Sequence, residues 1–257
     1  MTDSPPAAPT GEPLTAEQVL QELESLADVE HALIVEYLSV SCALGGELEE
    51  TEGGGTSPQG REASKAAAIL AQAEMRHLKN ICNALVDAGR TPTLGRASSI
   101  ASPSGDEVPL DPPTTDQLRD LLRREHAITS AVDSAYTRLA RALTPGLFEE
   151  SLLGRLRSVA GAGATHAGGT ATLRAALGDP PPPDFLRVPR RETSDPFEKR
   201  LLRTSDLSYR LVVDALRAQF AQPDVFAFSS LATSAMDVLD MSNKSLAQRG
   251  LLPDFGP

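Results

Sequence analysis

Residues 60–89 read GREASKAAAILAQAEMRHLKNICNALVDAG, and this stretch decides the fold. Its apolar residues recur every three or four positions, which predicts an amphipathic helix that Gly89 ends. The stripe that should face the core carries two polar residues, Glu74 and His77, one helical turn apart. An ionised carboxylate buried without a partner costs several kcal/mol by order of magnitude. A buried acid beside a buried base therefore calls for a compensating charge, and a metal ion commonly supplies it in helix bundles.

The composition indicates a soluble protein with one globular domain. The chain has 257 residues, of which 40% are hydrophobic and 23% charged, and aromatic residues make up only 4%. The net charge of −11 argues against a nucleic-acid partner, because phosphate binding needs a basic surface. No apolar run approaches the roughly 20 residues of a membrane helix, and the N-terminus has no signal-peptide pattern. Cys42 and Cys82 are too few for a disulfide framework and are expected to be small buried residues, so we expect a cytoplasmic protein without membrane contact.

The apolar periodicity predicts an all-α chain. Residues 1–13 are rich in proline and are expected to be a disordered tail, and residues 14–257 are expected to form a single helical domain. Its core bundle should span residues 14–177 and a C-terminal helical pair residues 195–250. The helices are expected over residues 15–44, 60–88, 115–143, 147–177, 195–220 and 224–249.

The connection over residues 90–115 is far longer than the usual bundle loop, so it could cross the bundle from one helix pair to the other. No alternating strand pattern of useful length occurs. In the last two helices, the apolar positions expected to face the core are Leu202, Leu207, Leu211, Val212, Leu216 and Phe220, then Phe228, Leu231, Met236, Leu239 and Leu246.

The two halves of the predicted bundle look like copies of each other. Glu30-His31-Ala32-Leu33 in the first helix matches Glu125-His126-Ala127-Ile128 in the third, and His77 in the second helix matches His166 in the fourth. Each half is thus a helical hairpin with a carboxylate in its first helix and an imidazole in its second. All four histidines of the chain fall inside this pattern.

A buried Glu on helices one and three, with Glu-x-x-His on helices two and four, is the di-metal carboxylate arrangement of four-helix bundles. On these residues the chain resembles the ferritin-like superfamily across residues 14–177. More narrowly, the runs Val29-Glu30-His31-Ala32 to Tyr37-Leu38 and Glu74-Met75-Arg76-His77-Leu78 to Pro92 resemble the ferritin-like domain of iminophenylpyruvate dimer synthase-type proteins. Members of that group often accompany bacterial specialised-metabolite pathways.

The resemblance implies a set of metal ligands with one member missing. The matching positions are Glu30, Glu74, His77, Glu125 and His166. Gly163 stands where the fourth helix should carry its Glu, and it removes side-chain volume beside the metal. The resemblance therefore implies either a mononuclear site or an asymmetric metal pair, with space for substrate at Gly163. Asp133 lies about 80° off the stripe and is not expected to replace the missing carboxylate.

Three further residues lie near the predicted ligands. Tyr37 shares the helix face of Glu30, where its phenol could donate a hydrogen bond, hold a radical or bind substrate, or simply pack in the core. His31 and His126 each follow their Glu directly and point about 100° away from it, so we expect them to flank the site rather than bind metal.

Carboxylate and imidazole ligands with an open position suit iron, with manganese as the alternative. The sequence therefore favours an O2-dependent non-haem metal oxidase or oxygenase, with O2 and a small organic substrate as partners and a homodimer allowed. The first alternative is an iron-oxidising or peroxide-detoxifying protein like ferritin or rubrerythrin. Gly163 counts against it, as does the lack of paired Cys-x-x-Cys sites. The second alternative is a metal-free helical binding protein.

Overall fold

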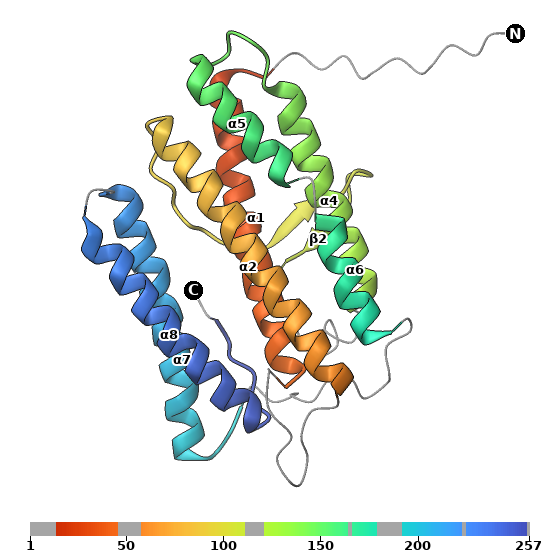
Figure 1. The fold of residues 1–257 in the computed structure, drawn as a ribbon, viewed down its shortest axis with the longest axis vertical. Coiled ribbons are helices and arrows are strands. Elements are labelled where there is room, and N and C mark those ends of the chain that lie inside the picture. The colour runs from red at the N-terminus through yellow and green to blue at the C-terminus, as the bar shows by residue number, and fades with distance from the viewer. Residues whose placement is uncertain are drawn as a thin grey trace, which may run out of the picture.

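The computed structural model describes residues 14–45, 58–110, 121–163, 166–178, 192–222 and 225–255. The side chains of residues 121–125, 163, 166–169 and 226 lie outside this description, as does the predicted tail over residues 1–13. Within the described residues the all-α prediction is confirmed (Figure 1). The helices are α1 (Ala16–Ala43), α2 (Pro58–Asp87), α4 (Leu121–Ala142), α5 (Glu150–Gly163), α6 (His166–Leu177), α7 (Pro196–Ala221) and α8 (Phe226–Gln248).

Local signals set the ends of α1. Thr15 caps its N-terminus through a reciprocal capping box, in which Gln18 N–H donates to Thr15 Oγ1 over 3.3 Å and Thr15 N–H donates to Gln18 Oε1 over 2.9 Å. At the other end the chain turns through Gly45, whose φ of 98° suits glycine. Residues 29–37 are buried on every side of the helix, which makes α1 the central helix of the molecule.

Helix α2 packs against α1 along much of its length and ends where Gly89 adopts a φ of 77°, as the sequence predicted. Helices α5 and α6 pack against the other side of α2, and α4 contacts α1, α5 and α6. Figure 1 shows α1, α2, α4 and α6 side by side with their long axes roughly aligned. The core between them consists mainly of leucine, isoleucine, valine and alanine side chains, with Tyr37 and Tyr136 among them.

The long connection after α2 contains a small sheet that the sequence did not predict. Strands β1 (Ser99–Ala101) and β2 (Glu107–Pro109) pair antiparallel, with Ile100 opposite Val108. Three-residue strands are too short to show an alternating pattern, which explains the omission. The backbone N–H of Ala97 donates to the carbonyl of Asp28 over 3.0 Å, so the connection lies against α1.

The predicted fourth helix over residues 147–177 is present as two helices, α5 and α6, whose axes run in different directions in Figure 1. Residues 164 and 165, which separate them, lie outside the described residues, so the continuity of this helix stays a prediction. Glycines at positions 161, 163, 168 and 169 crowd the junction, and glycine is among the poorest helix formers.

Helices α7 and α8 form a hairpin that packs mainly against itself and, less extensively, against α1 and α2. Asp195 caps α7 by accepting from the backbone N–H groups of Phe197 and Glu198. The predicted core faces of this pair are partly wrong. Four of the expected core positions are exposed, namely Leu207, Leu211, Leu231 and Met236. No described helix is long and apolar enough to cross a membrane.

Candidate metal centre

Three of the predicted ligands converge in the core. Glu30 comes from α1, and Glu74 and His77 come from adjacent turns of α2. One ligand atom from each lies within 4.8 Å of the other two. The Glu30 and Glu74 side chains are 0% and 1% exposed and that of His77 is 15% exposed, so the cluster is closed to water except along the imidazole.

The histidine bridges the two carboxylates. His77 Nδ1 lies 2.9 Å from Glu74 Oε2 and 3.8 Å from Glu30 Oε2. Burial acts to lower the pKa of His77, but the hydrogen bonds and negative charges of Glu30 and Glu74 together outweigh it and raise the pKa to about 9. At neutral pH and without a metal, the imidazole is therefore protonated and donates to Glu74.

A tyrosine from α4 completes the cluster. The buried Tyr136 hydroxyl donates a short hydrogen bond to Glu30 Oε1. Burial, together with the charge of Glu30, raises the pKa of Tyr136 well above its usual value, so the phenol keeps its proton. Tyr136 is eight residues after Ile128 on the same helix, where apolar residues also recur at Val132 and Leu139, and no role was predicted for it. The sequence feature that could have pointed to it is its hydroxyl, a polar group among the apolar residues that recur along this helix face.

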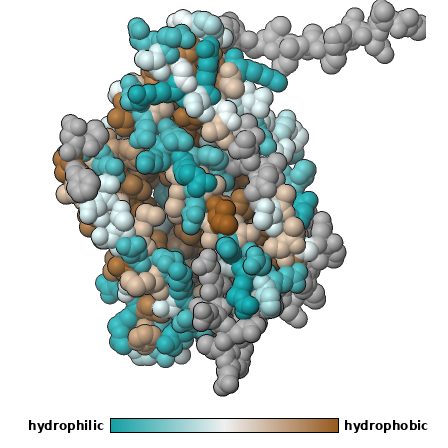
Figure 2. Space-filling view, in the orientation of Figure 1, coloured by the Kyte–Doolittle hydropathy of each residue, from teal (hydrophilic) through white to brown (hydrophobic). Residues whose placement is uncertain are grey.

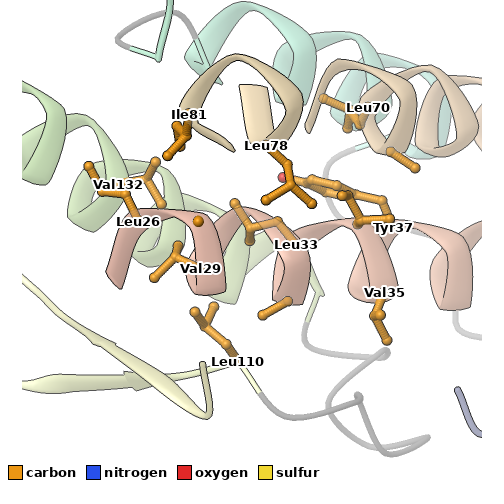
Figure 3. Packing of buried hydrophobic residues seen from close by; sticks show 14 of the residues in the cluster. Leu26, Val29, Leu33, Val35, Tyr37, Leu70, Leu78, Ile81, Leu110 and Val132 are labelled. Atoms are coloured by element: carbon orange, nitrogen blue, oxygen red, sulfur yellow. The ribbon is translucent and has the colours of Figure 1, made fainter. Parts of the chain in front are cut away.

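Apolar side chains surround the cluster. Figure 3 shows Leu33 of α1, Leu70 and Leu78 of α2 and Val132 of α4 packed between the helices. Tyr37 is 1% exposed, and its ring runs from α1 toward Leu78, which follows His77 directly (Figure 3). A shell of this kind keeps water from a metal and from any reactive group bound beside it.

The three residues fit a divalent transition-metal ion. Two ligand atoms at right angles around an ion, each about 2.1 Å from it, lie about 3 Å apart. The 2.9 Å and 3.8 Å separations from His77 Nδ1 need only a small adjustment to reach this geometry. Two carboxylates balance the charge of one divalent ion once His77 gives up its proton, and the phenol of Tyr136 already fixes the other oxygen of Glu30.

The remaining predicted site residues are placed only by their backbones. Glu125 lies in the first turns of α4, Gly163 ends α5 and His166 begins α6, but their side chains are outside the described part of the chain. Their roles remain predictions. Glu125 precedes Tyr136 by eleven residues in α4, about 16 Å along the helix axis. That rise joins two backbone positions of α4 and does not place the Glu125 side chain, so Glu125 as a ligand stays a prediction.

The two other histidines lie away from the cluster. His126 is exposed on α4. His31 is buried, and its Nδ1–H donates to the carbonyl of Gly95 over 2.8 Å while its Nε2 accepts from the hydroxyl of Tyr209 over 2.7 Å. Burial lowers the pKa of His31, which agrees with this neutral tautomer. His31 therefore joins α1 to the long connection and to α7.

Comparison of the chain with models of protein families, with curated proteins and with solved structures finds no match.

Proposed function

We propose that the protein is an O2-dependent non-haem metal oxidase or oxygenase with a ferritin-like fold, and that Glu30, Glu74 and His77 hold one ion of iron or manganese. The observation that carries the proposal is the convergence of two fully buried carboxylates and one imidazole within 4.8 Å. Iron and manganese prefer ligand sets of this oxygen and nitrogen type. The ferritin-like topology is supported by two helix pairs joined by one long connection (Figure 1).

The number of protein ligands favours catalysis over a structural metal. Three side chains leave positions free on an ion that takes five or six ligands, and catalytic sites keep such open positions. A bound redox metal would supply the means to activate O2. The chain's own residues bind the ion, set the orientation of Glu30 through Tyr136 and exclude water through Leu33, Leu70 and Leu78.

Metal content tests the first part of the proposal. Protein purified without chelator should hold about one iron or manganese per chain, and Glu74→Ala should lose it. His126→Ala changes an exposed histidine of α4 and should keep the metal. A wild-type chain that holds no metal, or a Glu74→Ala variant that holds as much as wild type, would refute the metal site.

Oxygen consumption tests the second part. The chain loaded with Fe(II) under anaerobic conditions should consume O2 in proportion to its bound iron when air is admitted, and His77→Ala should not. When about 20 equivalents of Fe(II) are added, an oxidase that acts on organic substrates should not oxidise the excess in repeated cycles. Rapid oxidation of all the added iron would instead show an iron-oxidising protein of the ferritin type.

A further inference from the structure

The outer face of α8 carries a regular stripe of apolar and small side chains that is exposed in the described part of the chain, except at its last member, the half-buried Ser245. Among the described residues, every exposed large hydrophobic side chain except Ile69 lies between residues 197 and 241, in or beside the α7–α8 hairpin. Figure 2 shows brown and tan atoms mixed with teal ones over the lower left of the molecule, the side on which Figure 1 places the α7–α8 hairpin. The stripe itself consists of Ala227, Leu231, Ser234, Val238, Met241 and Ser245.

The spacing of the stripe is that of a coiled-coil seam. Successive members are separated by four, three, four, three and four residues. A second stripe on another face of α8 has the same alternation and is buried within the chain, at Ala232, Ala235, Leu239, Ser242 and Leu246. Helix α8 therefore carries two faces with the spacing of a helix-packing surface, and the α7–α8 hairpin uses only one of them.

The two serines of the outer stripe are compatible with helix packing. The buried stripe also contains a serine, Ser242, whose hydroxyl donates to the carbonyl of Val238 on its own helix over 2.8 Å. A serine on a helix can satisfy its hydroxyl in this way and still lie in a packed interface. Ser245 already does so, since its hydroxyl donates to the carbonyl of Met241 over 2.9 Å. The large apolar members, Leu231, Val238 and Met241, then supply the surface that is buried.

Charges beside the stripe match a second copy of the same helix. Asp237 and Lys244 lie on the same flank, each immediately before a member of the stripe, Val238 and Ser245. Consider two copies of α8 packed antiparallel, with Val238 of one facing Met241 of the other. The residues that directly precede Val238 and Ser245 then lie along the same edge of the contact in both copies and face each other. Each Asp237 then meets the partner's Lys244, and the two-fold axis makes both pairs favourable.

Lys244 already takes part in an ion pair within its own helix. Lys244 pairs with Asp240 one turn earlier over 2.8 Å, at the surface, where such a pair is exchanged or extended at little cost. Asp237 has no ion-pair partner within the described residues and is exposed.

We infer that the chain forms a two-fold symmetric dimer through the outer stripe of α8, with the two helices antiparallel and Asp237 of each copy paired with Lys244 of the other. The stripe runs from Ala227 to Ser245, about 27 Å along the helix. One helix pair of that length buries less surface than the standard interface of about 1,600 Å². We therefore expect a weak dimer that forms at micromolar and not at nanomolar concentrations of the chain. The metal centre takes no part in it, so chelator should not change it.

Sedimentation equilibrium of the full chain from about 1 to 300 µM tests this contact. The average mass should rise from 27.2 kDa toward twice that value as the concentration increases. Met241→Glu should raise the Kd by at least about 100-fold, since the change enters the interface twice and each copy costs about a factor of ten. The matched control is Met236→Glu. Met236 lies on the same helix and is 39% exposed, against 61% for Met241, but it is off the stripe. This variant should dimerise as wild type does.

The charge pairs provide an independent check on the arrangement. Asp237→Lys alone and Lys244→Asp alone should each weaken the dimer, because each places like charges opposite one another. The double variant should restore the wild-type Kd. A chain that stays monomeric at 300 µM, or equal effects of Met236→Glu and Met241→Glu, would overturn the α8 interface. Single charge variants that dimerise as wild type does would overturn the proposed antiparallel register.

Discussion

Metal binding should expel one proton from the site, because the same nitrogen of His77 holds either the proton or the ion. To test this, metal is first removed from the protein with chelator, and the affinity for Mn²⁺ is then measured by titration at several pH values. The two neighbouring carboxylates keep the pKa of His77 near 9, so at pH 7 about 99% of the imidazole is protonated. A metal ligand must be a neutral imidazole, so the ion displaces this proton.

The size of the effect follows from that pKa. Below about pH 9 the apparent affinity should rise nearly tenfold with each pH unit, and above it the rise should stop. Between pH 6 and pH 8 the gain is about 90-fold, or about 2.7 kcal/mol of apparent binding free energy. A free histidine with a pKa near 6.5 would give only about a fourfold gain over the same range.

Isothermal titration calorimetry measures the proton directly. Titrations at pH 7 in two buffers of different ionisation enthalpy should show that about one proton is released for each Mn²⁺ bound. His126→Ala should release the same number, whereas His77→Ala should bind the ion more weakly and release almost none. Wild-type protein that binds Mn²⁺ without releasing a proton would refute the reasoning, since His77 would then be either neutral beforehand or not a ligand.

Three substitutions test how single groups contribute to the stability of the fold. Tyr136→Phe removes the hydroxyl that donates to Glu30, and should lower the free energy of unfolding of the metal-free chain in urea by about 1.5–3 kcal/mol; an unchanged value would show that the hydrogen bond is not stabilising. Gly95→Ala would put a methyl group 2.8 Å from the carboxylate of Asp28, and the displacement should cost about 1–3 kcal/mol, seen as a lower melting temperature. Gly154→Ala adds a methyl that meets nothing within 4 Å on a solvent-facing turn of α5, and should raise the unfolding free energy by about 0.5–1 kcal/mol in the same assay.

Helix ends were predictable because their signals are local. The Thr15 capping box and the turns at Gly45 and Gly89 involve residues three or four apart, and they lie within a residue or two of the helix ends expected at residues 15, 44 and 88. The burial of Glu30 and Glu74 was also predictable, because both fall in phase with apolar residues on a long, strongly periodic helix.

The core faces of the C-terminal pair were harder to predict, because α8 has two stripes with the same spacing. Periodicity shows that Leu231 and Leu239 each belong to such a stripe, but it does not show which stripe meets the rest of the chain. The structure buries Leu239 and exposes Leu231. An exposed stripe with the spacing of a core stripe is what an interface between chains produces.

The hydrogen bonds of two buried tyrosines to distant segments left only a weak signal in the sequence. Tyr209 bonds to His31 across 178 residues, and Tyr136 bonds to Glu30 across 106. Each tyrosine lies on an apolar helix face, where packing alone would explain it. Only the arrangement of α1, α4 and α7 in space shows that their hydroxyls meet polar partners.

Charge balance favours one ion over two at this centre. Glu30 and Glu74 supply two negative charges, which one divalent ion neutralises once the proton of His77 has left. A second divalent ion would add two positive charges in a buried, low-dielectric site and would need two more carboxylates. The predicted ligand set offers only one, Glu125, and Gly163 stands where the other should be. We therefore expect anaerobic titration with Fe(II) to saturate at about one ion per chain. Saturation at two would require carboxylates other than these to face the site.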